Sequence, residues 1–92
     1  MDDFNPSDRR KIQRFPQRNV FGSISYPKRR AAISCLVRDL SRSGARVWTL
    51  AVRIVPDVFR LTIDATGEFA DCTVVWRSET EIGVVFDREA PL

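Results

Sequence analysis

Asp39, Ser41 and Gly44 follow one another at the spacing Asp-x-Ser-x-x-Gly, between two strand-like apolar runs. A carboxylate accepts hydrogen bonds, a hydroxyl donates and accepts them, and glycine allows a positive φ or the close approach of another backbone. The same residue types are common in ordinary turns, where Asp and Ser bond their own backbone and glycine ends the loop. Alone, the motif indicates a turn, and it indicates a ligand site only with support from elsewhere in the chain.

Three arginines, Arg10, Arg14 and Arg18, precede the first strand-like run at intervals of four residues. A guanidinium group is a planar fork that matches phosphate oxygens. Eight basic and three acidic residues give residues 1–30 a net charge of +5, so the rest of the chain carries −2 of the total +3. This asymmetry suggests an anionic partner for the N-terminal segment. A solubilising tail is the simpler explanation of the charges taken alone.

The composition argues against several kinds of chemistry. The chain has no histidine, and Cys35 and Cys72 match no zinc or redox spacing, which removes most metal sites and the commonest general base. A Gly-rich phosphate loop and a G-x-S-x-G elbow are both missing from the sequence. Glu79 and Glu81 lie in a polar turn and are interpreted as solvated charges. We therefore expect no enzyme, metal or cofactor, and two cysteines that fill the core, with a disulfide or reactive thiol as the minor alternative.

From Val20 onward the apolar residues recur with a period of two. We predict six strands, "VFGSISY" (20–26), "AAISCLVRD" (31–39), "ARVWTL" (45–50), "VFRLTID" (58–64), "FADCTVVWR" (69–77) and "IGVVFD" (82–87). Turn-forming residues separate them, and Pro56 argues against a central strand in "LAVRIVPD". Because closure removes exposed edges, we predict an all-β fold, a six-stranded antiparallel β-barrel. A β-sandwich is the alternative.

The length of 92 residues fits one domain. Residues 1–19, interrupted by Pro6 and Pro16, are expected to be a flexible basic lead-in, residues 20–88 the barrel, and residues 89–92 a short tail. No apolar run is long enough to span a membrane, and the N-terminus lacks the apolar stretch of a secretory signal. We therefore expect a cytoplasmic protein with no membrane partner.

The two motifs, in this order around six strands, resemble those of the PilZ domain family, bacterial receptors for cyclic di-GMP. The family signature is R-x-x-x-R ahead of the first strand and [D/N]-x-S-x-x-G in the turn between the next two. The similarity runs from Arg10 to Asp87, and "CLVRDLSRSGARV" and "CTVVWRSETEIGVVF" look like the short single-domain members. The resemblance implies a six-stranded β-barrel and a non-enzymatic role in second-messenger signal transduction.

The resemblance places the cyclic di-GMP site at Arg14, Arg18, Asp39, Ser41 and Gly44, with Arg10 as an auxiliary charge. Arg14 and Arg18 stand directly before Val20, where the family has its pair, and the alternative register is Arg10 with Arg14. Pro16, between Arg14 and Arg18, favours an extended chain. The register actually used stays open at this point.

The chemistry of cyclic di-GMP suits these residue types. Arginine matches both phosphate oxygens and the O6 and N7 atoms of guanine. Asp39 could accept from the N1–H and N2–H₂ groups, and Ser41 could bond to the ligand or to the turn backbone. Trp48 and Trp76 could stack a base, but aromatic residues at strand spacing are interpreted as packing residues and left out of the site.

Three functions fit these features. In the first, cyclic di-GMP draws the arginine segment onto the barrel and changes its charge and shape for a downstream protein. In the second, the chain is an adaptor of the same fold that binds a protein and ignores the nucleotide. In the third, a small basic barrel binds single-stranded nucleic acid. The strand faces lack the interleaved aromatic and basic pattern of such barrels, so we expect cyclic di-GMP and a downstream protein as partners rather than nucleic acid.

Overall fold

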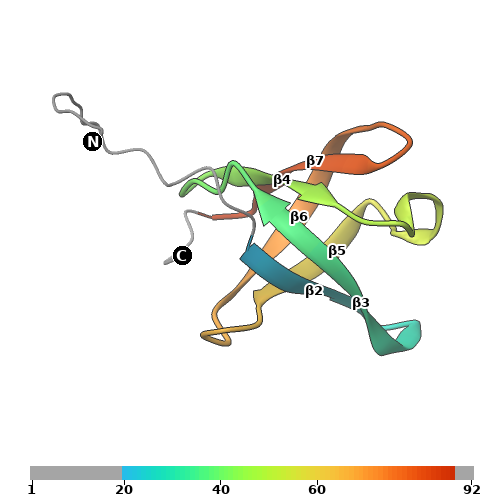
Figure 1. Cartoon of the computed structure of the whole chain (residues 1–92), viewed down its shortest axis with the longest axis horizontal. Coiled ribbons are helices and arrows are strands. Elements are labelled where there is room, and N and C mark those ends of the chain that lie inside the picture. The colour runs from blue at the N-terminus through green and yellow to red at the C-terminus, as the bar shows by residue number, and fades with distance from the viewer. Residues whose placement is uncertain (1–19, 89–92) are drawn as a thin grey trace, which may run out of the picture.

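The computed structural model describes residues 20–88, in which the strands close into an antiparallel barrel (Figure 1). The elements are β2 (Val20–Tyr26), β3 (Arg29–Arg38), β4 (Gly44–Trp48), the 3₁₀ helix η1 (Val52–Ile54), β5 (Val58–Ile63), β6 (Phe69–Arg77) and β7 (Glu81–Phe86). The order around the barrel is β2-β3-β4-β7-β6-β5, and β5 pairs with β2 to close it. The predicted six-stranded barrel is confirmed, and the β-sandwich alternative is wrong.

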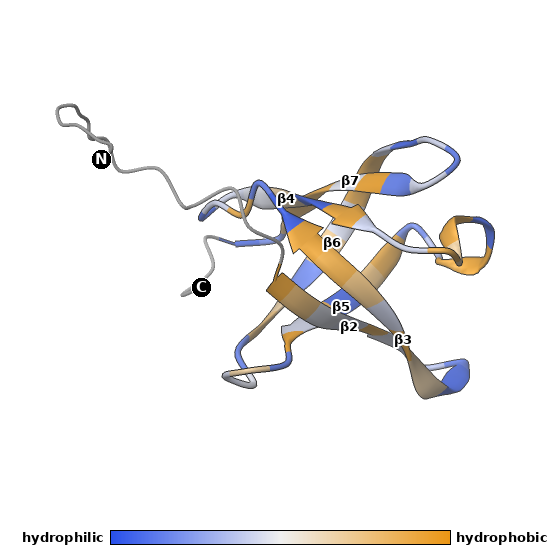
Figure 2. Ribbon diagram, in the orientation of Figure 1, coloured by the Kyte–Doolittle hydropathy of each residue, from blue (hydrophilic) through white to orange (hydrophobic). Residues whose placement is uncertain are grey.

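The period of two in the sequence becomes an inside and an outside of the barrel. In β5, Phe59, Leu61 and Ile63 are buried, whereas Arg60 faces solvent, as the alternation predicts. Figure 2 shows the same mixture of apolar and polar residues along the other strands. Full burial of one such aliphatic or aromatic side chain contributes about 1.5–3 kcal/mol. The enclosed core is therefore what holds the polar turns at fixed positions.

Four of the six strands, β3, β4, β5 and β7, have bounds that differ by one or two residues from the prediction, and the larger differences are in β3 and β4. β3 begins at Arg29 and ends at Arg38, because Tyr26 and Arg29 pair across a two-residue turn and Asp39 leaves the strand. β4 ends at Trp48 instead of Leu50, whose side chain is 88% exposed. The chain then turns into η1, and the segment around Pro56 is irregular, as predicted. The period of two fails where the chain leaves the barrel wall.

Arg77, the last residue of β6, holds the η1 segment against the barrel. Its Nη1 donates to the carbonyl oxygens of Val52 (2.9 Å) and Val55 (2.7 Å), and its Nη2 donates to Asp57 Oδ1 (2.8 Å).

Nowhere in residues 20–88 does a helix have the length and apolar character needed to cross a membrane.

The start of β2 lies beside the end of β3. Val20 pairs with Val37 in an antiparallel register, so the residue that opens β2 lies beside the strand that leads into Asp39. On the other side of β3, Arg38 pairs directly with Arg46 of β4. The chain that enters the barrel and the turn between β3 and β4 are thus brought to the same end of β3.

Candidate ligand-binding site

The turn that carries the Asp-x-Ser-x-x-Gly motif joins β3 to β4. Asp39 directly follows β3, and Gly44 is the first residue of β4, so the structure brings Asp39, Ser41 and Gly44 together in one short connection. Asp39 has a φ of 49°, in the left-handed region. Asp and Asn adopt this region more readily than other non-glycine residues. The residue type at position 39 therefore suits the backbone conformation of the turn.

Ser41 shapes the turn through its hydroxyl. The Oγ atom accepts from the backbone N–H groups of Ser43 (3.3 Å) and Gly44 (3.2 Å) and donates to the Gly44 carbonyl (3.1 Å). The Ser41 N–H also donates to that carbonyl, at 2.9 Å. Of the two roles expected for Ser41, bonding to the turn backbone is the one the structure contains.

The turn between β6 and β7 has the same hydrogen-bond pattern. Ser78 Oγ accepts from the N–H groups of Thr80 (3.3 Å) and Glu81 (3.0 Å), and the Ser78 N–H donates to the Glu81 carbonyl at 2.8 Å. Because this second turn lacks the Asp and Gly of the motif, the Ser41 bonds are ordinary turn chemistry. Ser41 fixes the shape of the site by the same means that Ser78 uses to begin β7 at Glu81.

Gly44 is required by a close approach of two strands. A Cβ atom at this position would collide with the carbonyl oxygen of Val84, in the adjacent strand β7. Among residues 20–88, positive φ angles occur at Asp39 and Gly67, so of the two roles open to Gly44 the structure shows the close approach of another backbone, and the left-handed residue of this turn is Asp39. The glycine allows β4 and β7 to pack closely at the edge of the turn.

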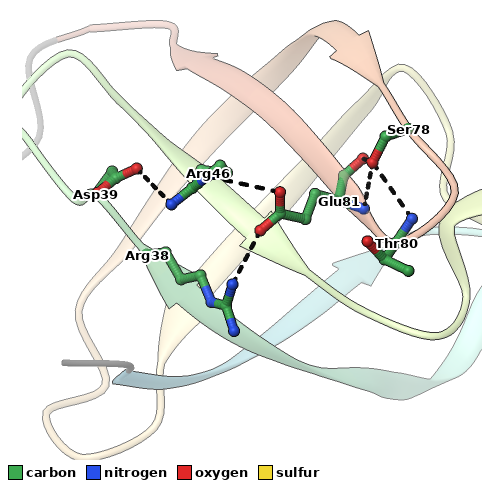
Figure 3. A network of polar contacts seen from close by, with 6 residues as sticks. All are labelled: Arg38, Asp39, Arg46, Ser78, Thr80 and Glu81. Carbon is green, nitrogen blue, oxygen red and sulfur yellow. Dashed lines mark hydrogen bonds and ion pairs between the residues drawn. The ribbon is translucent and has the colours of Figure 1, made fainter. Parts of the chain in front are cut away.

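Four charged side chains form a network beside the turn (Figure 3). Arg46 Nη2 lies 2.9 Å from Asp39 Oδ2, and its Nη1 lies 3.7 Å from Glu81 Oε1. Arg38 Nη1 lies 3.2 Å from Glu81 Oε2. Arg38 and Arg46 are directly opposite across β3 and β4, an arrangement that is unfavourable for like charges unless anions stand between them. Glu81 bridges the two guanidinium groups and so relieves their repulsion.

The interpretation of Glu81 as a solvated charge is wrong. Its side chain is only 17% exposed, because it lies on the first residue of β7 and reaches over β4 toward β3. The register between β4 and β7, which pairs Trp48 with Glu81, could not be read from the sequence. A signal for Arg38 and Arg46 did exist, since they flank the turn at positions that a short hairpin brings opposite each other.

Trp76 lies on the outside of the barrel, next to this network. It pairs with Gly83, which in turn pairs with Arg46, and the indole ring covers Gly83 so closely that a Cβ there would collide with it. The Trp76 side chain remains partly exposed. Trp48 is partly buried and pairs with Leu36 and Glu81. Both tryptophans thus pack on the barrel. Trp76 also presents an aromatic surface two strands away from Arg46, because both residues pair with Gly83, from opposite sides of β7.

The three arginines of the first motif, Arg10, Arg14 and Arg18, lie outside the described residues. The segment that carries them joins the barrel at Val20, which pairs with Val37, two residues before Asp39. Their assignment, including the choice between the two registers, stays a prediction. The same is true of the division of the chain at residues 19 and 89.

Both cysteines fill the core, as predicted. Cys35 and Cys72 are buried and free, and burial raises the pKa of each thiol to about 12. A thiol with so high a pKa is protonated near neutral pH and is a poor nucleophile. In the part of the chain that the structure describes, no group of three or more acidic or cysteine side chains could hold a metal ion.

Comparison with known families agrees with this architecture. The family model of the PilZ domain matches residues 8–91, nearly the whole chain. Comparisons with curated proteins and with solved structures gave no match. PilZ domains are of the cyclic di-GMP-binding type and act as non-enzymatic receptors or adaptors. With a closed barrel, the second motif in its turn and a family match of this extent, the chain belongs to the PilZ domain family.

Proposed function

We propose that the protein is a non-enzymatic receptor for cyclic di-GMP. The observation that carries the proposal is the placement of Asp39 beside the point where the arginine segment enters the barrel. Val20 pairs with Val37, two residues before Asp39, whose side chain is about half exposed at 49%. An exposed acceptor and the residue at which the arginine segment joins the barrel therefore lie at the same end of β3.

The length of the tether is compatible with a shared site. An extended chain spans at most about 3.5 Å per residue, so the Cα of Arg18 lies within about 7 Å of that of Val20, and the Cα of Arg14 within about 21 Å. A long arginine side chain adds further reach. Both guanidinium groups can therefore meet a ligand held at Asp39. We assign Arg10 an auxiliary role because it is farther along the chain from Val20 than Arg14 and Arg18 are.

The ligand's chemistry matches the two halves of this site. Cyclic di-GMP is a dianion whose guanine bases present O6 and N7 acceptors on one edge and N1–H and N2–H₂ donors on another. Arg14 and Arg18 would bind the phosphates or the acceptor edge, and Asp39 would accept from the donor edge. Neutralising the segment and folding it onto the barrel would change the surface that a downstream protein meets.

Calorimetric titration with cyclic di-GMP tests the proposal, with GTP, GMP and cyclic di-AMP as competitors of related chemistry. We expect cyclic di-GMP to bind most tightly, because adenine lacks the N1–H and N2–H₂ donors that Asp39 would accept. Equal affinity for cyclic di-AMP would remove the role of Asp39. Absence of binding to any of the four would favour the second candidate, an adaptor that binds only protein.

The adaptor function has its own supporting observation. Leu50, two residues before η1, and Ile54, the last residue of η1, have side chains that are 88% and 53% exposed. Figure 2 shows apolar residues dominating this protruding segment. An exposed apolar segment suits contact with another protein. A receptor could use the same segment after binding its ligand, so this observation supports a protein partner under both functions.

Binding of single-stranded nucleic acid makes a different prediction. Non-specific binding through the basic segment would weaken steeply with salt and would show no preference for a cyclic dinucleotide. We expect no tight complex with a single-stranded oligonucleotide at physiological salt. Titration of a fluorescent oligonucleotide at two salt concentrations measures this, and a tight complex at the higher salt would contradict the receptor function.

A further inference from the structure

Asp39, the proposed guanine acceptor, is held by a side chain that the sequence motif does not include. We propose that Arg46, anchored by Glu81, positions the Asp39 carboxylate and thereby sets the preference for guanine. The inference rests on the proposed function, and it assigns to Arg46 and Glu81 a role in specificity. Arg46 acts here through Asp39, so it is a positioning residue and is not counted among the ligand contacts.

Asp39 needs such a partner because of where it lies. It follows the last residue of β3, its side chain is about half exposed, and its backbone is in the left-handed region. An aspartate in such a turn can otherwise turn its carboxylate toward neighbouring backbone N–H groups or into solvent. The ion pair of Oδ2 with Arg46 Nη2, at 2.9 Å, fixes one carboxylate oxygen, and the inference assigns the other, Oδ1, to donors on a ligand.

Arg46 is itself held from two sides. Its Nη1 atom faces Glu81 Oε1 at 3.7 Å, and its Nε atom is buried and has no hydrogen-bond partner within residues 20–88. The Nε atom is thus shielded from solvent although the side chain as a whole is 41% exposed, so the guanidinium group keeps its outer nitrogens, Nη1 and Nη2, for the two carboxylates. Arg38 adds to this arrangement, because it occupies the other carboxylate oxygen of Glu81 at 3.2 Å.

Glu81 is less exposed than the two arginines it contacts. It opens β7, its N–H is bound by Ser78 Oγ at 3.0 Å, and its side chain is the least exposed of the four in the network (Figure 3). The largely buried carboxylate of Glu81 on β7 therefore orients Arg46 on β4. Arg46 in turn orients the exposed carboxylate of Asp39, which follows β3. The three side chains come from three places along the chain, the turn after β3, the middle of β4 and the start of β7, which explains why the linear motif does not contain them all.

A double-mutant cycle on ligand affinity separates positioning from direct contact. Arg46→Met keeps most of the side-chain volume and removes the charge, and Asp39→Gly removes the carboxylate while suiting the positive φ. We expect Arg46→Met to weaken cyclic di-GMP binding about ten-fold, the effect of one lost charge-assisted hydrogen bond. In the Asp39→Gly background the same change should have no further effect. Additive losses would mean that Arg46 acts on the ligand directly, and would overturn the inference.

Selectivity is the readout that a purely structural role would not change. In the Arg46→Met protein the ratio of affinities for cyclic di-GMP and cyclic di-AMP should fall toward one. Arg60→Met is the matched control, since Arg60 also forms an exposed ion pair with an aspartate, Asp71, but on β5 and β6. The control should leave affinity and selectivity unchanged. A ratio unaffected by Arg46→Met would count against positioning even if affinity fell.

Glu81→Gln tests the anchor without changing the side chain's shape. If Glu81 positions Arg46, the variant should bind cyclic di-GMP several-fold more weakly, whereas Glu68→Gln, in the exposed turn after β5, should bind like the parent. If Glu81 instead competes with the ligand for the arginines, Glu81→Gln would bind more tightly, and the inference would be wrong. Arg46→Lys, which keeps the charge and loses the planar fork, replaces Arg46→Met should that protein fail to fold, with the same expected direction.

The outcomes for the two proposals can be told apart. Binding by the unaltered protein together with an additive cycle would leave the receptor function standing and reject the positioning role. Absence of binding by the unaltered protein would reject the receptor function and, with it, the inference. Circular dichroism and thermal melts of every variant establish that a changed affinity comes from a folded barrel.

Discussion

At the scale of single residues, Asp39 combines a backbone and a side-chain requirement. Its φ of 49° favours Asp, Asn or Gly, and its carboxylate pairs with Arg46 at 2.9 Å. Substitution by alanine would therefore strain the turn as well as remove the acceptor. This is why Asp39→Gly is the better probe of the carboxylate alone.

The arginine variants decide which register of the first motif is used. Loss of a charge-assisted hydrogen bond costs about 1.5–3 kcal/mol, or roughly one to two decades of affinity. Arg14→Ala and Arg18→Ala should each weaken cyclic di-GMP binding by that amount. Arg10→Ala should weaken it less, because a charge at a distance is screened beyond about 8 Å at physiological salt. Calorimetric titration of the three single variants measures the differences.

Thermal melts of the ligand-free arginine variants are the control. The melting temperature should not change, because the buried core side chains of the described residues lie between Ile24 and Phe86. Loss of binding in Arg10→Ala with no effect of Arg18→Ala would shift the motif to Arg10 and Arg14. Three variants that bind like the parent protein would contradict the receptor mechanism.

Gly44→Ala should destabilise the barrel for a steric reason. The added Cβ would collide with the Val84 carbonyl of β7, which is backbone and cannot move aside cheaply. Overpacking of this kind costs about 1–3 kcal/mol, and each kcal/mol lowers the melting temperature of a domain this size by about 4–8 °C. Gly67→Asn is the control, since Gly67 has open space around it and Asn tolerates its positive φ. A Gly44→Ala protein as stable as the control would contradict the close approach.

At the scale of secondary-structure elements, the two serine turns are the comparable units. Ser41 and Ser78 make matching sets of hydrogen bonds to the residues two and three positions ahead. Ser41→Ala and Ser78→Ala should therefore lower the free energy of unfolding by similar amounts, about 0.5–1.5 kcal/mol each. Urea denaturation measures both. A Ser41→Ala protein that keeps full stability but loses ligand affinity would show instead that the hydroxyl contacts the ligand.

At the scale of the whole molecule, burial of two thiols in the closed core makes stability depend on pH in the alkaline range. Burial raises the pKa of Cys35 and Cys72 to about 12, whereas an unfolded thiol titrates at about 8.5. The folded state therefore holds these protons more tightly, so their contribution is fully present below the unfolded pKa and is lost as the pH rises toward 12. We expect the free energy of unfolding to fall from about pH 8.5 upward.

Cys72→Ala isolates this contribution. The variant should be less stable at all pH values because of the small cavity, but its stability should fall less steeply with pH above about 8.5. Urea denaturation at a series of alkaline pH values measures the slope. An unchanged slope would mean that the buried thiol does not account for the loss.

A thiol reagent should also leave both cysteines unmodified in the folded protein and label both after denaturation.

The sequence by itself determined the six strands and the position of the turn, whereas the pairing of β2 with β5 in the structure decided between a barrel and a β-sandwich. Alternation of apolar residues is a local property of each strand, and Phe59, Leu61 and Ile63 show it without reference to any other part of the chain. The cysteines were likewise recognisable as core residues from their apolar surroundings. The Asp39–Gly44 spacing was recognisable because its residues lie within a single connection. The sequence did not show that Asp39 has a positive φ and also forms an ion pair with Arg46.

Only the tertiary structure decided which charged residues meet. Arg38, Arg46 and Glu81 lie on three strands, and their contacts depend on the register of β4 against both β3 and β7. A shift of one residue would turn each side chain to the other face of the sheet, and no local pattern fixes the pairing of distant strands. Glu81 was therefore misread as a solvated turn residue, although closure of the barrel makes it the largely buried anion between two arginines.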